Sequence, residues 1–238
     1  MNTMNKMFIA GAIALASAGA NAGVIDTSST LLDDVGATQL ENWLGQGDLD
    51  WTSIWYGEEG ASSTSWHSAV DGVGPTVSIY QATNYLGEQI LVGGFTTMDW
   101  SGSGYKADNS AFLFNLTTGE HQAVAFNNLH SIYTNISYFA TFGGGHDLHG
   151  GNNTLGNTDY TYSYSYDQSQ GRIDIEGDTG SGSGSTGAPT ASFNVQALET
   201  FTFTASLGGE ESSSSVPLPA SAALLGLGLL GFVRRKTK

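Results

Sequence analysis

Short apolar runs separated by glycine and polar residues constrain the fold of this chain more than any other feature. Ile90–Phe95 and Ala111–Leu116 are rich in branched and aromatic residues, and Gly, Asp, Asn and Ser bound them. Each run is too short for a helix, so both predict buried strands. Gly93–Gly94 predicts a bulge or a close approach of the backbone, and Gly143–Gly145 predicts either a tight turn or a close approach of another element.

The rest of the body repeats this pattern. Ala111–Leu116 and His121–Phe126 are predicted to be the two strands of a hairpin. Helices are predicted only over Leu31–Leu44, where Val35, Leu40, Trp43 and Leu44 recur at helical spacing, and over Ser65–Val70. Further strands are predicted at Trp51–Tyr56, Thr76–Tyr80, Ile136–Phe142, Thr158–Asp167 and Arg172–Glu176, and a last pair of strands is predicted over Phe193–Ala205. The sequence therefore predicts a mainly β fold with short flanking helices, of the α+β class.

The first 22 residues have the organisation of a secretory signal peptide. Lys6 precedes an apolar run over Met7–Leu15, and Ala20 and Ala22 flank Asn21 as a small-x-small cleavage site. The run is too short to span a membrane. Signal peptidase is the expected processing partner.

The C-terminal tail, residues 212–238, consists of a linker and a signal of three parts. A serine linker leads into a short motif and an apolar run that ends at Val233, and a basic cluster follows. From Ala220 the run is about 21 Å long as a helix, which is short of a full span. The residues of the motif and cluster are Val216, Pro217, Leu218, Pro219, Ala220, Arg234, Arg235 and Lys236.

This tail resembles the PEP-CTERM sorting signal in its VPLPA variant, which an exosortase processes in Gram-negative bacteria. Leu218 replaces the usual glutamate and leaves the subclass of sorting enzyme open. The alternative is an ordinary tail anchor. The resemblance implies export, transient anchoring in the inner membrane with the basic end cytoplasmic, and then a place on the outer cell surface or outside the cell.

The charge distribution limits the classes of molecule that the body is expected to bind. All 22 acidic residues lie between Asp26 and Glu211, while Lys106 and Arg172 are the only basic residues between the terminal segments, so the body carries a net charge of −20 with neutral histidines. Such a surface repels phosphate backbones, and nucleic acid is not expected as a partner. The chain has no cysteine, which excludes disulfides and thiol chemistry.

The body, residues 23–211, resembles the TLDc domain of the oxidation-resistance proteins. The matching segments are QLENWLGQGDLDWTSIW, WHSAVDGVGPTVSIY, ILVGGFTTMDW, AFLFNLTTG, TFGGGHDL and FNVQALETFTF. They span 39–204 in the family's order. The resemblance implies a compact two-sheet β-sandwich with flanking helices. It implies little chemistry, because the family has no agreed catalytic residues.

Two groups of side chains are candidate binding residues. Tyr160, Tyr162, Tyr164 and Tyr166 alternate with threonine and serine, so on a strand they share one face, which is either a sugar-stacking platform or a face packed on the core. His146, Asp147 and His149 are the one place where metal ligands crowd together. Because a strand would point His146 away from both others, we expect a structural turn and no bound transition metal.

No motif for catalysis is present. The chain has neither a G-x-S-x-G nor an H-E-x-x-H pattern. His67 is expected to be a packed or solvated histidine. We therefore expect an exported binding or protective module without cofactor, whose partner is an extracellular polysaccharide or an envelope protein. The alternative is an extracellular enzyme acting on polysaccharide or oxidants.

Overall fold

The computed structural model describes residues 23–84, 86–125, 129–162, 165–166, 182–183, 189–191 and 193–206. The predicted signal peptide and tail, and the predicted strand Arg172–Glu176, lie outside these residues. The described chain is mostly β-strand with two short helices and antiparallel sheets, which confirms the predicted α+β, sandwich-like fold class.

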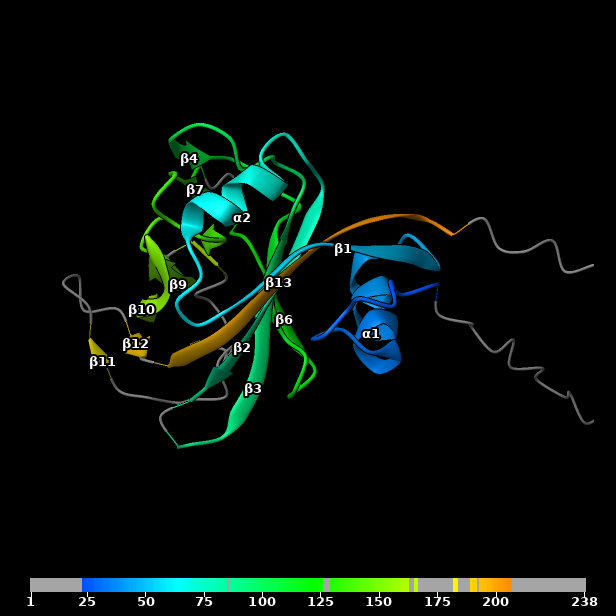
Figure 1. The fold of residues 1–238 in the computed structure, drawn as a ribbon, viewed down its shortest axis with the longest axis horizontal. Helices are drawn as coiled ribbons and strands as arrows, with labels where there is room; N and C mark the ends of the chain where they lie inside the picture. The colour runs from blue at the N-terminus through cyan, green and yellow to red at the C-terminus, as the bar shows by residue number, and fades with distance from the viewer. Residues whose placement is uncertain are drawn as a thin grey trace, which may run out of the picture. The chain divides into compact units, whose positions relative to one another are not determined.

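A six-stranded antiparallel sheet forms the centre of the domain (Figure 1). Its strand order is β1-β13-β2-β3-β5-β6. The strands are β1 (Leu49–Glu58), β2 (Thr76–Thr83), β3 (Gln89–Thr96), β5 (Phe112–Asn115), β6 (Glu120–Ala123) and β13 (Asn194–Ala205). The last strand in the described part of the chain, β13, therefore lies between β1 and β2, so the two ends of the described domain are hydrogen-bonded in one sheet.

The remaining strands form two smaller sheets. A three-stranded sheet has the order β4-β7-β8, with β4 (Gly104–Lys106), β7 (Ile132–Thr134) and β8 (Thr141–Phe142). A four-stranded sheet has the order β11-β12-β10-β9, with β9 (His149–Asn152), β10 (Thr154–Tyr162), β11 (Gly182–Ser183) and β12 (Pro189–Ala191).

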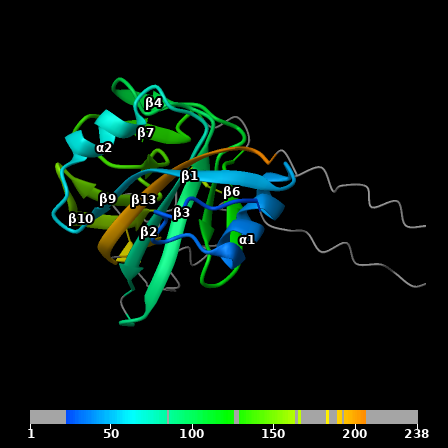
Figure 2. The same cartoon turned by 45° about the vertical axis from the view of Figure 1, so that its right-hand side comes forward.

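The two helices pack on opposite sides of the central sheet. Helix α1 (Asp34–Leu44) lies on one side, and helix α2 (Ser63–Val70) lies on the other together with the smaller sheets (Figures 1 and 2). Two hydrophobic clusters correspond to these sides. The α2 side contains Trp66, Tyr80 and Leu198. The α1 side contains Leu40 and Phe201.

Helix α1 has its ends fixed by local sequence. The Asp33 side chain accepts the Gly36 N–H at 2.8 Å, and Gly45 adopts the left-handed conformation (φ 65°) that ends the helix. The predicted helix over Leu31–Leu44 starts later than expected, because Asp33 is the N-cap. Val35, predicted on the buried face, is 76% exposed.

The glycine pair in β3 marks a close approach, as predicted. A side chain on Gly94 would lie 2.5 Å from the Phe142 ring, and one on Gly93 would meet the Phe114 ring. Gly143 supplies the left-handed residue of the predicted turn (φ 86°). The missing side chains therefore let aromatic rings pack directly on the sheet backbone.

Three strand predictions differ from the structure. Phe193–Ala205, predicted as a pair of strands, forms the single strand β13. Ile136–Phe142 is not one strand, because the chain turns at 136–140 and only β8 remains at its end. The Asn135 side chain accepts the Ser137 N–H at 3.0 Å and stabilises this turn. The strand predicted over Thr158–Asp167 corresponds to β10, which begins earlier and is described over Thr154–Tyr162. The predicted hairpin is confirmed, with Asn115 opposite Glu120.

Candidate functional site

Of the predicted tyrosine face, the structure describes the side chain of Tyr166 only. Tyr160 and Tyr162 lie in β10, where only the backbone is described, and Tyr164 lies outside the described residues. Tyr166 is 1% exposed, and its hydroxyl donates to the Ser131 carbonyl at 2.6 Å. Burial, followed by the charges of nearby aspartates, raises the pKa of Tyr166 well above its ordinary value. Tyr166 therefore lies in the hydrophobic core, as the alternative of a face packed on the core predicts for this residue.

The predicted group His146, Asp147 and His149 is only partly brought together. The rings of His146 and His149 lie with their centroids 5.2 Å apart. The Asp147 carboxylate instead accepts backbone N–H groups of Ser165 at 2.9 Å and Tyr166 at 3.1 Å. Among the residues that the structure describes, no group of three or more histidine, aspartate or glutamate side chains is placed to hold a metal ion.

The two histidines belong to a larger group of rings, which we call the Tyr–His cluster. Its members are Tyr105, His130, Tyr133, Tyr138, His146 and His149. Neighbouring centroids lie between 4.5 Å, for Tyr105 and His130, and 5.5 Å, for Tyr138 and His146. The cluster runs from Tyr105, which is 43% exposed, to His149, which is 1% exposed. It packs the turn at Gly143–His146 onto the three-stranded sheet.

Electrostatics keep the inner end of the Tyr–His cluster uncharged. Burial and the neighbouring His146 lower the pKa of His149 from 6.5 to about 3. Burial also lowers the pKa of His146. His149 Nδ1 lies 3.0 Å from the Thr141 hydroxyl, and the Tyr105 hydroxyl donates to the Gly144 carbonyl at 2.9 Å. These contacts fix the turn, including the left-handed backbone of His146 (φ 62°).

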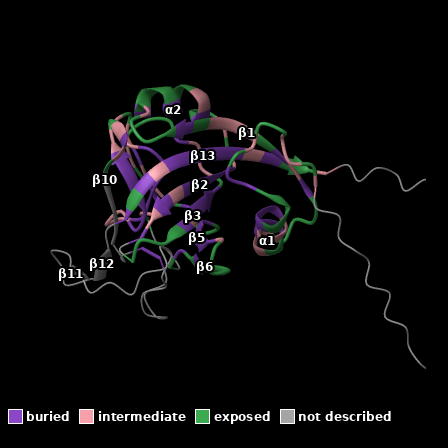
Figure 3. Cartoon of the chain, turned by 60° about the horizontal axis from the view of Figure 1, so that its bottom comes forward, coloured by how far each residue is buried: buried purple, intermediate pink, exposed green. Residues whose placement is uncertain are grey.

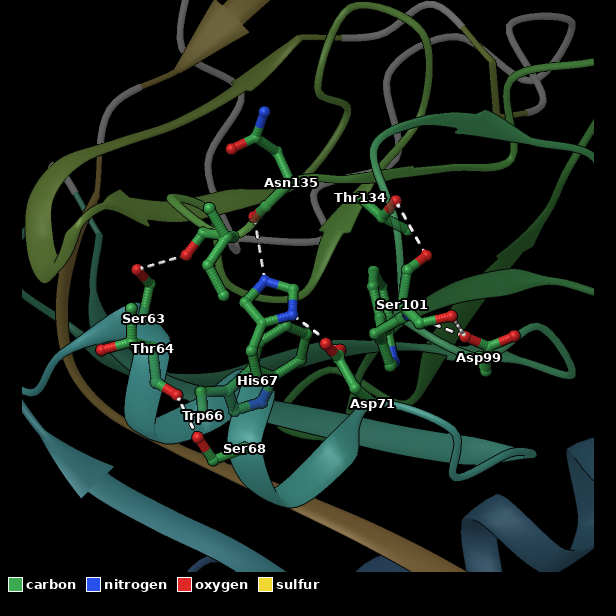
Figure 4. Close-up of polar contacts among 12 residues, drawn as sticks. Ser63, Thr64, Trp66, His67, Ser68, Asp71, Asp99, Ser101, Thr134 and Asn135 are labelled. Atoms are coloured by element: carbon green, nitrogen blue, oxygen red, sulfur yellow. Dashed lines mark hydrogen bonds and ion pairs between the residues drawn. The ribbon is translucent and has the colours of Figure 1, made fainter.

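A second histidine site lies between α2, which carries His67, and the segment at Asn135 (Figure 4). His67 is 3% exposed, and its Nδ1 lies 2.7 Å from an Asp71 carboxylate oxygen. Its Nε2 lies 2.9 Å from the carbonyl of Asn135 and 3.0 Å from that of Tyr138. Nε2 therefore carries a proton and donates to these carbonyls, and both ring nitrogens face oxygen acceptors. His67 holds the turn after β7 against α2.

The buried carboxylates are used in the same way. Glu199 is fully buried, and it accepts the N–H groups of Thr30 at 2.9 Å and Leu31 at 2.7 Å and the Ser53 hydroxyl at 2.6 Å. Glu41 accepts the Leu49 N–H at 3.0 Å and the indole N–H of Trp51 at 3.1 Å. Both carboxylates tie the segment before β1 to the central sheet.

Among the described residues, Asp108 is the remaining buried carboxylate outside the Tyr–His cluster. It accepts the Thr97 N–H at 2.6 Å and the Thr96 hydroxyl at 2.8 Å. Burial alone raises the pKa of Asp108, but hydrogen bonds from Ser110, Thr97 and Thr96 outweigh it and hold the pKa below the ordinary value. Asp108 therefore remains an ionised structural acceptor.

The fold is an α+β domain built on antiparallel sheets, with the central sheet between two helices. Its buried ionisable groups hold separate segments together by hydrogen bonds. The chain belongs to the TLDc domain family, whose model matches residues 25–204. A PEP-CTERM protein-sorting motif matches residues 215–236. A comparison with the curated proteins finds no match.

These matches confirm both family resemblances. The PEP-CTERM motif implies processing by an exosortase and export to the cell envelope or the extracellular space. None of the helices in the described part of the chain is long and apolar enough to cross a membrane.

Proposed function

We propose that the exported TLDc domain is a non-enzymatic binding and protective module. The observation that supports this is the use of its buried ionisable groups. Glu41, Asp108, Asp147 and Glu199 all accept backbone N–H groups, and both nitrogens of His67 face protein oxygens. A general acid or base must reach the proton that it transfers, and these groups are already engaged within the fold.

The export route is part of the proposal. Signal peptidase removes residues 1–22 after Ala22, and the tail then holds the chain in the inner membrane through its apolar run. An exosortase separates residues 212–238 from the domain at the Val216–Ala220 motif. The mature domain, 23–211, reaches the outer cell surface or the extracellular space. This order places the acidic body outside the cell.

The partner is an extracellular polysaccharide or an envelope protein. The surplus of acidic residues over Lys106 and Arg172 supports this choice against polyanions such as nucleic acids. Because the domain needs no cofactor for binding, the proposal includes none.

Fractionation of cells that produce a tagged protein tests the proposal. The tagged domain is expected in the envelope or matrix fraction and is expected to release no products from the isolated matrix. A protein recovered only as free monomer in the medium would contradict the binding role. Protein-dependent release of sugars, or about one zinc or iron per chain by elemental analysis, would favour the enzyme alternative.

A further inference from the structure

The face of the central sheet that carries α1 is covered over only part of its length. Val77 and Ile79 of β2 lie in the hydrophobic cluster beneath α1. Gln81 and Thr83 follow Ile79 at the same spacing of two residues, so their side chains point to the same side of the sheet. In Figure 3, the ends of β13, β2 and β3 away from α1 include partly buried and exposed segments.

The strand register extends this uncovered area over four strands. Gln81 lies opposite Leu91 in β3 and Ala197 in β13, and Thr83 lies opposite Gln89. In β1, Tyr56 lies opposite Glu199 and Glu58 lies opposite Ala197. We call this area the open sheet face and define it by Tyr56, Glu58, Gln81, Thr83, Gln89 and Gln196.

Two hollows lie on the open sheet face and meet at Gln81. The first has a volume of about 300 Å³ and lies between the segment Thr30–Asp33 and the side chains of Gln89 and Leu91. The second has a volume of about 330 Å³ and is lined by Tyr56, Glu58, Glu59 and Gln196. Both volumes are at the lower end of those found for small-ligand sites. Two adjoining open hollows suit neighbouring units of a chain that lies across the strands.

The amides on this face are well placed for hydroxyl-rich ligands. Gln89 Nε2 and Gln196 Nε2 each donate to the Thr83 hydroxyl at 2.5 Å, which fixes both side chains across three strands. Each amide still has a second N–H and a carbonyl oxygen. Gln81, between them, makes no side-chain hydrogen bond with any described residue. Paired donors and acceptors match sugar hydroxyls, which also donate and accept.

Tyr56 adds an aromatic surface at the edge of the second hollow. It is 39% exposed, and its hydroxyl lies 3.3 Å from Glu58. Partial burial, and then the charges of Glu58 and Glu199, raises the pKa of Tyr56, so the phenol keeps its proton. A tyrosine ring with an exposed face and a polar tip can stack on the C–H face of a sugar ring.

Charge decides between polysaccharide classes. Asp33, Glu58 and Glu59 line the hollows, and no lysine or arginine is among the lining residues. A chain of uronates or phosphates would be repelled here. The cores of protein interfaces are depleted in charged residues and enriched in aromatic residues. The open sheet face is instead rich in amide side chains, which favours a polysaccharide over a protein as the ligand.

We propose that the open sheet face binds a neutral polysaccharide, whose chain crosses β3, β2, β13 and β1 with successive sugar units in the two hollows. This rests on the proposed function as a binding module and names its ligand class and site. The Glu199 carboxylate positions the first hollow, because it holds the backbone N–H groups of Thr30 and Leu31 in its wall.

The test uses the mature protein recovered from the producing cells. The probe is the extracellular polysaccharide of the producing cells, divided by anion exchange into a neutral and an acidic fraction. Affinity electrophoresis in gels that contain each fraction gives the dissociation constants. The neutral fraction is expected to retard the domain and the acidic fraction is not. Retardation by the acidic fraction alone overturns the proposed ligand class.

Variants locate the site. Gln81→Ala and Tyr56→Ala are each expected to weaken binding about tenfold, which corresponds to the loss of one good contact. Gln39→Ala on α1 and Tyr105→Ala in the Tyr–His cluster are matched controls that lie outside both hollows, and they are expected to bind within twofold of the wild type. Gln81→Glu keeps the size of the side chain and serves if Gln81→Ala does not fold.

The outcomes separate this inference from the proposed function. Unchanged binding by folded Gln81→Ala and Tyr56→Ala overturns the site, while the domain remains a binding module. Binding to whole matrix without binding to its neutral polysaccharide overturns the ligand class only. Absence of binding to matrix and to both fractions contradicts the inference and the proposed function together.

Discussion

The carboxylate of Glu199 accepts the backbone N–H of Leu31 at 2.7 Å across 168 residues of sequence. Glu199 lies on β13, which pairs with β1 in the central sheet. From this position its carboxylate holds the segment that precedes α1. The carboxylate has no exposed surface. It thereby fixes the N-terminal segment and one wall of the open sheet face at once.

Glu199→Ala is expected to destabilise the domain by about 2–4 kcal/mol, because it leaves the N–H groups of Thr30 and Leu31 without their acceptor. Glu199→Gln keeps one acceptor oxygen and is expected to lose less. Urea unfolding of both variants measures the difference. The exposed Glu120→Ala serves as control, and equal stability of Glu199→Ala and this control would contradict the assigned role.

The contact between Gly94 and Phe142 supports a second prediction. A methyl group on Gly94 would lie 2.5 Å from the Phe142 ring, which is fully buried. Gly94→Ala is therefore expected to cost about 1–3 kcal/mol through overpacking. Phe142→Leu provides room, so the double variant is expected to be more stable than the sum of the single effects predicts. Simple additivity in thermal unfolding would show that the ring is not the obstacle.

The sequence predicts which segments form the central sheet better than it predicts which side chains lie together on a face of that sheet. Ile90–Phe95 and Ala111–Leu116 reveal their strands because their apolar residues form compact runs. Gln81, Gln89 and Gln196 carry no such signal. They share a face only because β13 lies beside β2 and β3 beside β2, which is a non-local arrangement.

The Tyr–His cluster is missed for the same reason. Tyr105 and Tyr133 lie opposite each other in β4 and β7, two short strands with no clear alternation in sequence. Conversely, Tyr160–Tyr166 has strong alternation in sequence, but the side chain described for this segment, that of Tyr166, is buried in the core. Periodicity reports the local backbone, whereas the partner that covers a face depends on topology.

Acid is expected to destabilise the domain through His149. Its pKa is about 3 in the folded domain and 6.5 for the ordinary side chain. Below pH 6.5 the unfolded chain binds the proton first, so stability is complete above this pH and falls as the pH approaches 3. The maximum slope is about 1.4 kcal/mol per pH unit.

Urea unfolding between pH 4.5 and pH 7 measures this dependence. His121 and His146 also have lowered pKa values and act in the same direction, whereas Asp108 contributes mainly at lower pH. The comparison of wild type with His149→Asn isolates the contribution of His149. A variant with the same slope as the wild type would show that His149 is not the group responsible.

The C-terminal tail is expected to be absent from the exported protein. The sorting motif covers residues 215–236, and the apolar run from Ala220 is only about 21 Å long as a helix, which makes a weak permanent anchor. Intact mass of the exported protein is expected to show loss of everything after about Val216–Ala220. Substitution of Pro217 and Pro219 by Ala is expected to leave the tail attached and the protein in the membrane fraction, while Pro189→Ala, outside the motif, is processed normally. An exported protein that still ends at Lys238 would contradict cleavage and support a permanent tail anchor.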